Sequence, residues 1–286
     1  MNLNKLFVAF MLILASAPDS RAESARVRWL MGTFCEIDAW GAQDTPSAVT
    51  AAFNEIDRWD KILSLYKKES ELNVLNASAG TGPFRASAEL YAQTEAALRL
   101  ARETGGAFDP TVLPVLKGGA AALPLVGWSK VRLDAQKHTI DLPLKGMGLD
   151  FGGIGKGWAL DQAAAVLLRR GVKGAFLNFG GQILTVGRPD GGTLWTVVLP
   201  GFKDSLKTGE ASVSTSGDTE RPGHIVSPFD GRPVRRKVSA TAVLATATDA
   251  DAWSTALYVL GQAPTNYHGR SFFTASPFVP IKGESQ

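Results

Sequence analysis

Cysteine is almost absent from this chain: Cys35 is the only one among 286 residues. A single thiol cannot form a disulfide within the chain, and it offers no second thiolate for redox chemistry or a zinc site. The residues around it, 29–37, have a composition typical of a strand. We therefore interpret Cys35 as a small buried apolar residue.

The sequence also has little excess of charge of either sign, with 30 Lys and Arg against 27 Asp and Glu. Binding to nucleic acid requires cations clustered on one face of a protein. The near balance of charge therefore argues against nucleic acid as the main partner. We interpret the dense basic run as a solvated loop; it consists of Arg232, Arg235, Arg236 and Lys237.

The N-terminal segment contains an uncharged apolar run, residues 6–17, that is too short to span a bilayer. Lys5 precedes this run, and Ser20 and Ala22 place small residues at positions −3 and −1 of a cleavage site. A positive start, a short apolar run and small residues before the cut are the three parts of a secretory signal. We therefore predict a signal peptide over residues 1–22.

Removal of that segment would leave residues 23–286 as an exported protein, located in the periplasm if the source has an outer membrane. A retained membrane anchor is the alternative, because the length of the apolar run alone does not decide between them. No cysteine follows the run, which argues against a lipoprotein anchor.

The rest of the chain alternates between helical and strand patterns without a strict βαβ order. Apolar residues that recur at three- and four-residue steps, with glycines after the last turns, predict helices over residues 47–65, 87–104, 158–170 and 250–260. Alternating or β-branched segments predict strands over residues 26–40, 175–186, 194–199 and 239–248, and a hairpin over 131–142. The fold class that follows is α+β (mixed α/β).

A glycine-rich segment, residues 149–161, contains four glycines and Lys156 just before the third predicted helix. Such a turn exposes backbone N–H groups beside the positive end of a helix, which suits phosphate oxygens. It is not a Walker loop, because Asp150 and Gly157 stand where that motif needs Gly and Ser or Thr. A structural turn before a helix remains the alternative.

Asp251 and Thr255 lie four residues apart at the start of the last predicted helix, and therefore on one face of it. A carboxylate and a hydroxyl in that arrangement offer oxygen ligands to a hard cation such as Mg²⁺. The alternative is that Asp251 only caps the helix, a position at which Asp is favoured.

Two further segments could contact a ligand. Residues 214–218 combine small hydroxyl side chains with glycine, and residues 224–233 begin with His224, a possible base. Tyr66 follows the first predicted helix and could stack on an aromatic ring system, although a tyrosine at the rim of the core is an equally simple interpretation.

Taken in chain order, these segments resemble the FAD:protein FMN transferase (ApbE) family. The similarity extends from Met31 to Gly261 and is strongest at residues 150–157 with Asp161. The other matching segments are Met31-Gly32-Thr33, Ser64-x-Tyr66, Ser70-Glu71-Leu72, Gly106-Ala107-Phe108-Asp109, Gly180-Gly181, Thr215-Ser216-Gly217-Asp218, His224 to Pro233 and Ala250 to Thr255.

The resemblance implies a fold and a reaction. It implies one large ApbE-like domain over residues 23–286, built from two interleaved lobes and T-fold-like. Members of the family cleave the pyrophosphate of FAD, attach FMN through a phosphoester to a Thr or Ser of an acceptor flavoprotein, and release AMP, with Mg²⁺ on the pyrophosphate. The partners so implied are FAD and an exported acceptor protein, with contact to a membrane only through the acceptor's complex.

The resemblance also implies roles for single residues. The metal ligands would be Asp251, Thr255, the backbone carbonyl of Gly153, and Ser254. Contacts to FAD would come from Asp150, Lys156, Met31, Tyr66 and Val226. His224 would be the catalytic base that takes the proton from the acceptor hydroxyl.

The chain departs from the family pattern at several positions. Ser254 stands where many members have Asp, and a hydroxyl binds a cation less strongly than a carboxylate does. Ser227 stands where Asp usually precedes the proline. Residues 116–119 replace a loop with the family pattern Leu-Trp-Gly-Phe, and the strand pair expected after Gly261 is not recognisable.

These departures leave two other functions open. Water could replace the protein acceptor, which would make the chain an FAD pyrophosphatase that yields FMN and AMP. Alternatively, a weakened metal site would make it a non-catalytic FAD carrier or an assembly factor for an exported redox complex.

Overall fold

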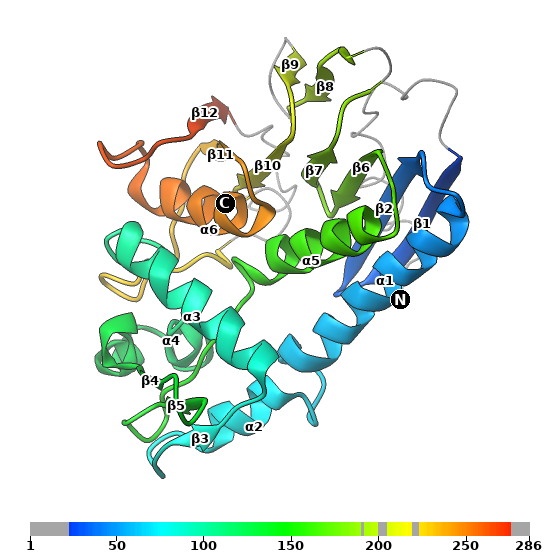
Figure 1. Ribbon diagram of the computed structural model, residues 1–286. Coiled ribbons are helices and arrows are strands. Elements are labelled where there is room, and N and C mark those ends of the chain that lie inside the picture. Colours follow the sequence, from blue (N-terminus) through cyan, green and yellow to red (C-terminus); the bar gives the residue numbers. More distant parts are fainter. Residues whose placement is uncertain (1–22, 190–191, 200–204, 219–222, 276–286) are drawn as a thin grey trace, which may run out of the picture.

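The computed structural model describes residues 23–189, 192–199, 205–218 and 223–275. The predicted signal peptide, residues 1–22, lies outside this part of the chain. The described residues form two lobes (Figure 1). The larger lobe uses both ends of the described chain, and the smaller one is formed by the segment between them, so the lobes are interleaved as expected.

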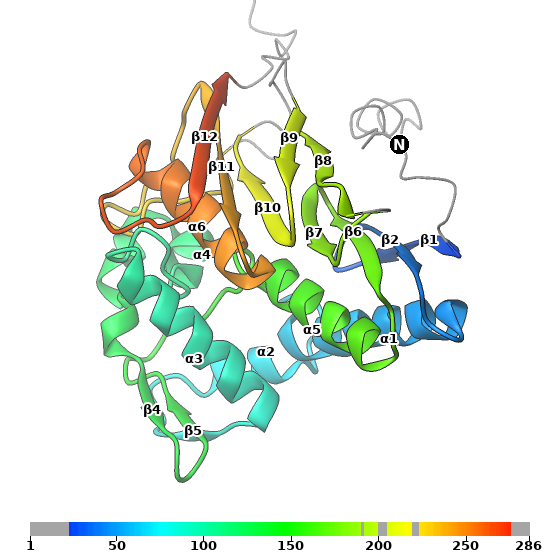
Figure 2. The same ribbon diagram turned by 45° about the horizontal axis from the view of Figure 1, so that its top comes forward.

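The large lobe is built on a seven-stranded sheet with the order β1-β2-β6-β7-β10-β11-β12, in which every neighbouring pair is antiparallel. The strands are β1 (Ser24–Leu30), β2 (Thr33–Trp40), β6 (Gly174–Phe179), β7 (Gln182–Val186), β10 (Ala211–Ser216), β11 (Val238–Leu244) and β12 (Arg270–Ala275). Three helices, α1 (Thr45–Leu63), α5 (Gly155–Arg169) and α6 (Ala247–Leu260), lie in a row against one face of this sheet, as Figure 2 shows.

The main core lies between the sheet and these helices. Helix α1 begins at the cap Asp44, whose side chain accepts a hydrogen bond from Ser47 N. Its apolar residues recur at helical spacing and are buried, among them Val49, Phe53 and Ile56. Cys35 of β2 is fully buried in the same core and is a free thiol, as predicted, and burial raises its pKa to about 12.

The opposite face of the sheet carries a second, smaller core under the hairpin β8 (Trp195–Val198) and β9 (Ser205–Thr208). Trp195 packs there against Trp40 and Phe176, with ring centroids 5.5 and 5.8 Å apart. The hairpin covers the middle of this face, whereas Trp29 and Phe34 of the β1–β2 pair remain exposed.

The small lobe contains the helices α2 (Glu71–Ala77), α3 (Ala88–Glu103) and α4 (Leu113–Gly118), the 3-10 helices η2 (Ala120–Leu125) and η3 (Trp128–Lys130), and a sheet of β3 (Phe84–Arg85), β5 (Thr139–Asp141) and β4 (Arg132–Asp134) in that order. Ser87 caps α3 by accepting a hydrogen bond from Leu90 N. Within the described residues, no helix is long and apolar enough to cross a membrane.

The structure confirms the mixed α/β class and most of the predicted elements, with four corrections. Helix α5 begins at Gly155 rather than Trp158, so the end of the glycine-rich segment is already helical. Residues 175–186 form two antiparallel strands instead of one, because Gly180 and Gly181 reverse the chain at positive φ.

The other two corrections concern the C-terminal part. Strand β11 ends at Leu244, and Thr248, expected in a strand, lies in the first turn of α6. The segment after Gly261, which gave no prediction, contains β12, and this strand pairs with β11.

Candidate active site between helices α5 and α6

The N-terminal turns of α5 and α6 meet in direct contact. Gly157 N donates a hydrogen bond to Asp251 Oδ2 at 3.0 Å. A Cβ atom at position 157 would lie 2.1 Å from Ala247 O and 2.9 Å from the Asp251 Cβ. Only glycine allows the two helices to approach this closely, and this explains one of the glycines that the sequence analysis assigned to a phosphate-binding turn.

Asp161 fixes the start of α6 from the second turn of α5. Its carboxylate accepts hydrogen bonds from Ala247 N and Thr248 N at 2.8 Å each, and a third from the Thr248 hydroxyl at 2.5 Å. Burial raises the pKa of Asp161, and the hydrogen bonds from Thr248 and Ala247 act in the opposite direction. The interaction satisfies N–H groups at the N-terminus of α6 that have no partner within the helix.

Asp251 and Thr255 occupy one face of α6, as their spacing predicted. The cap of this helix is Thr246, whose side chain accepts from Asp249 N, so the alternative interpretation of Asp251 as the cap is wrong. Asp251 is 5 % exposed and lies in the second turn. A Cβ atom at Gly153 would lie 3.0 Å from Thr255 Oγ1, so the backbone of the glycine-rich segment comes close to this face.

Strand β10 contributes two serines that the sequence analysis did not assign to the metal site. Ser216 Oγ lies 2.8 Å from Ser254 Oγ and 3.4 Å from Thr255 Oγ1, and Ser214 Oγ lies 3.1 Å from Ser254 Oγ. The signal in the sequence is the period of two, which places alternate serines on the face of the strand toward α6. These hydroxyls were missed because β10 itself was not predicted.

The glycine-rich segment also places two charged groups near this point. Lys156 Nζ lies 3.9 Å from Asp251 Oδ2. Asp150 Oδ1 accepts a hydrogen bond from Gly152 N at 2.6 Å. Burial raises the pKa of Asp150, while that hydrogen bond and the nearby charges of Lys117 and Lys156 act to lower it.

The predicted flavin contacts and the predicted base come from three other segments: the turn between β1 and β2, the segment after α1, and the segment between β10 and β11. Met31 has a positive φ of 45° in the β1–β2 turn, and its Cε would lie 3.8 Å from a Cβ at Gly155. Tyr66 is 92 % exposed, and Val226 pairs with Pro233 in an isolated bridge. His224 is also exposed, in the segment between β10 and β11.

The donor set suits a hard cation, although it contains little charge. In the part of the chain that the structure describes, no three His, Cys, Asp or Glu residues group as metal ligands. Asp251 is one carboxylate beside several hydroxyls, and Mg²⁺ is commonly bound by one or two carboxylates together with the phosphates of a substrate. The residues present therefore fit Mg²⁺ bound together with a phosphate-containing ligand.

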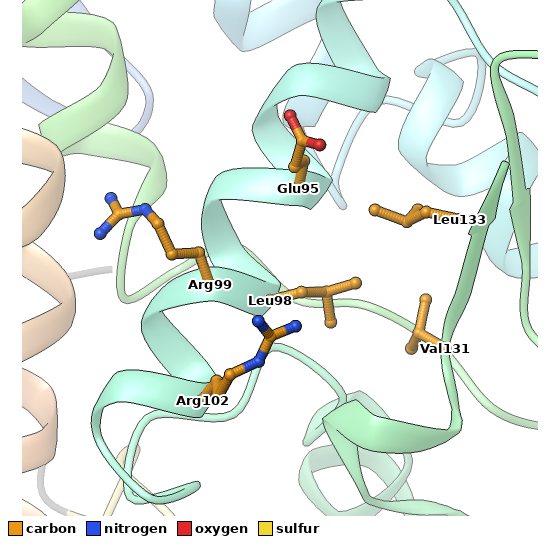
Figure 3. A pocket seen from close by; sticks show the side chains of 6 residues that line it. All are labelled: Glu95, Leu98, Arg99, Arg102, Val131 and Leu133. Atoms are coloured by element: carbon orange, nitrogen blue, oxygen red, sulfur yellow. The ribbon is translucent and has the colours of Figure 1, made fainter. Parts of the chain in front are cut away.

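A separate pocket of about 320 Å³ lies in the small lobe, on α3 and the segment that leads into β4 (Figure 3). It is lined by Glu95, Leu98, Arg99, Arg102, Val131 and Leu133. None of the predicted site residues lines it, and Arg99 also binds Asp249 of α6 at 2.6 Å. The pocket therefore does not belong to the cluster around Asp251.

Comparisons with known proteins agree with this fold. A sequence model described as the ApbE family matches residues 31–268. The FAD:protein FMN transferase of Treponema pallidum is 29 % identical, covering 84 % of this chain and 79 % of that protein. The protein of the same name from Escherichia coli K12 is 28 % identical, covering 81 % and 76 %.

Solved structures show the same fold. The flavin transferase ApbE from Vibrio cholerae superimposes with a TM-score of 0.73 at 25 % identity, covering 83 % of this chain and 86 % of that one. The apo form of the Pseudomonas stutzeri flavinyl transferase ApbE gives 0.78 at 24 % identity, covering 90 % and 93 %. The family match and the named relatives show a transferase enzyme, and the chain belongs to the ApbE family.

Proposed function

We propose that this protein transfers FMN from FAD to a Thr or Ser hydroxyl of an exported flavoprotein, in a reaction that depends on Mg²⁺ and releases AMP. The observation that carries the proposal is the junction of α5 and α6, where Asp251, Lys156 and the Gly157 N–H converge. Phosphoryl transfer requires charge neutralisation and alignment of the nucleophile more than covalent help from the protein.

Four groups would hold the cation: Asp251 Oδ1, Thr255 Oγ1, the carbonyl oxygen of Gly153, and more weakly Ser254. Bound there, Mg²⁺ would neutralise charge on the pyrophosphate. The Gly157 N–H occupies Asp251 Oδ2, which fixes the direction of the other carboxylate oxygen. Lys156, half-buried at the start of α5, would contact the phosphates as a point charge.

The remaining residues would serve the flavin and the acceptor. Asp150, Met31, Tyr66 and Val226 would contact FAD around the glycine-rich segment. The acceptor oxygen would attack the phosphorus on the FMN side, the bond from that phosphorus to the bridging oxygen would break, and AMP would leave. His224 would take the proton from the acceptor hydroxyl, a task that suits an imidazole near neutral pH.

The compartment is part of the same proposal. Residues 1–22 would direct export, and the mature protein would act in the periplasm on an exported acceptor. Any contact with a membrane would come through the complex that contains the acceptor.

Intact mass of an acceptor domain tests this function. The protein is incubated with FAD and Mg²⁺, with and without a threonine-bearing domain of an exported flavoprotein. We expect the acceptor to gain the mass of one FMN, and EDTA to abolish the gain.

Two other results would point to the alternatives. Release of FMN and AMP with no gain in acceptor mass would indicate an FAD pyrophosphatase. Bound but intact FAD would indicate a non-catalytic carrier, the function that Ser254 and Ser227 would favour.

A further inference from the structure

Four hydroxyl groups from two elements gather beside Asp251, and we refer to Ser214, Ser216, Ser254 and Thr255 as the hydroxyl cluster. Ser254 is its centre: its Oγ lies 2.8 Å from Ser216 Oγ and 3.1 Å from Ser214 Oγ, and also donates to Asp251 O at 2.9 Å. Ser214 and Ser254 are buried, whereas Ser216 and Thr255 are half-buried. The cluster therefore leads from the core of the large lobe to its accessible edge.

The charge of Asp251 is opposed by that of a lysine. Ser254 donates a hydrogen bond to the backbone carbonyl of Asp251, and Lys156 Nζ lies 3.9 Å from Asp251 Oδ2. The backbone N–H of Gly157 also donates a hydrogen bond to Asp251 Oδ2. The protein thus offers a divalent cation one carboxylate that is already compensated, together with neutral oxygens.

Such a set of ligands binds Mg²⁺ weakly by itself. Mg²⁺ gives up its water reluctantly, and the affinity of oxygen sites for hard cations increases with the number of charged ligands. Hydroxyls complete a coordination sphere without adding negative charge. A phosphate-containing substrate can supply the charge that the protein lacks.

We infer that the cation and FAD enter this site as one unit, and that Ser254 sets this dependence. The inference rests on the proposed function, because it takes FAD as the ligand. The pyrophosphate supplies the negative charge, and the hydroxyl cluster supplies neutral oxygens around it. In the protein without FAD, the site does not retain a divalent cation.

The location of Ser254 explains why this residue would determine whether the cation binds without FAD. It follows Asp251 by three residues on the same helix, so a carboxylate at 254 would stand beside that of Asp251. Ser216, whose oxygen is 2.8 Å away, reaches the same point from β10. A second carboxylate introduced from either element should therefore allow the cation to bind without FAD.

Binding of Mn²⁺, followed by the paramagnetic resonance signal of the free ion, tests the inference without any turnover. The purified protein is titrated with Mn²⁺ alone and in the presence of FAD, with subtraction of a titration of FAD without protein. We expect the affinity for Mn²⁺ to increase by at least about tenfold when FAD is present.

Variants test whether the lack of a second carboxylate causes the dependence of cation binding on FAD. Ser254→Asp should bind Mn²⁺ without FAD at least about tenfold more tightly than the wild type, and Ser216→Asp should do so even if Ser254→Asp does not fold. Ser254→Ala, which adds no charge, should show no such gain. Ser205→Asp, at an exposed position on β9, adds the same charge elsewhere and should also show none.

Equal affinity for Mn²⁺ with and without FAD in the wild type would overturn the inference. Folded Ser254→Asp and Ser216→Asp variants with no increase in affinity would overturn the assignment to Ser254. Failure of FAD to bind at all, measured by flavin fluorescence, would instead contradict the proposed function itself.

Discussion

At the scale of single residues, Asp251 is a buried carboxylate at the start of α6. It is a carboxylate that is 5 % exposed, and its partners are a backbone N–H and a lysine. Burial of a charge is costly unless it is paired or binds a metal, so such a residue needs a compensating role. Binding of the cation on the pyrophosphate of FAD is the role that we assign to it.

Asp251→Asn tests this role because it keeps the shape of the side chain and removes the charge. We expect the rate of FMN transfer to fall by at least about 10²-fold, since the charge on the pyrophosphate would be left without its cation. Asp249→Asn is a matched control, because Asp249 lies on the same helix but binds Arg99 instead. Full activity of Asp251→Asn would show that the metal lies elsewhere.

In the proposed function, His224 serves proton transfer rather than binding. His224→Ala should therefore lower the rate of transfer by about 10²–10⁴-fold while the affinity for FAD is retained. Rates from intact-mass time courses and affinities from flavin fluorescence separate the two effects. His268→Ala, at an exposed position outside the site, should change neither; loss of FAD binding in His224→Ala would make His224 a structural residue.

Asp38 of β2 predicts a pH dependence of stability that is independent of the active site. It is 7 % exposed, its Oδ1 has no hydrogen-bond partner among the described residues, and burial, together with the charge of Glu36, raises its pKa from 3.8 to about 6. Between these two values the native state binds more protons than the unfolded state. The contribution of Asp38 to stability is thus present below pH 4 and is lost as the pH rises to about 6.

Asp38→Asn removes this titration, so the variant should be more stable than the wild type at pH 7, by on the order of 2 kcal/mol. Thermal unfolding between pH 4 and 7 measures the effect: the melting temperature of the wild type should fall more steeply with increasing pH than that of the variant. Identical pH profiles for wild type and variant would contradict the prediction. Glu36→Gln, which removes only the neighbouring charge, should shift the wild-type profile to lower pH.

At the scale of elements, the site depends on how closely α5 and α6 approach each other. Gly157 makes that approach possible, and Asp161 holds the first residues of α6 from α5. The hydrogen bond from Gly157 to Asp251 then places the carboxylate. The helix junction would therefore support the proposed metal ligands.

Gly157→Ala should separate the two helices, because its Cβ would lie 2.1 Å from a backbone oxygen. Overpacking of this kind costs about 1–3 kcal/mol or more, and the displaced Asp251 should also lose the cation. The melting temperature and Mn²⁺ binding in the presence of FAD are the two measurements. Gly209→Ala is the control, since a Cβ there meets nothing within 4 Å; unchanged Mn²⁺ binding in Gly157→Ala would argue against the junction as the support.

The sequence predicted the elements whose signals are local. The helices α1, α3 and α6 were recognised from their apolar spacing, and the pairing of Asp251 with Thr255 followed from helical geometry. Strand β10 was missed because it is rich in small hydroxyl residues and its pairing with β7 and β11 is not local. Ser214 and Ser216 were lost from the predicted metal site for the same reason.

The contact between Gly157 and Ala247 could not be predicted either, because it joins residues far apart in the sequence. The glycine-rich segment was interpreted either as a phosphate-binding turn or as a structural turn before a helix, and at least Gly157 serves helix packing. Patterns of spacing identify a face of a helix, but they do not identify which other element approaches that face.

At the scale of the whole molecule, the interleaved lobes place the site where the middle segment returns to the sheet. The glycine-rich segment connects the small lobe to α5, and α6 covers β10 and β11 beside it. The groups that we propose for the cation thus come from the glycine-rich segment and from the last helix, and the serines beside them come from the sheet. Because these groups lie far apart in the sequence, the segments that match the family are spread over nearly all of the described residues.

The position of a cation in crystals grown with FAD and Mn²⁺ tests this account most directly. The anomalous signal of Mn²⁺ should lie within about 2.5 Å of Asp251 Oδ1 and Thr255 Oγ1, with the pyrophosphate of FAD beside it. A peak elsewhere, for example beside Glu36 and Asp38, or FAD bound in the small-lobe pocket, would contradict the assignment of the site.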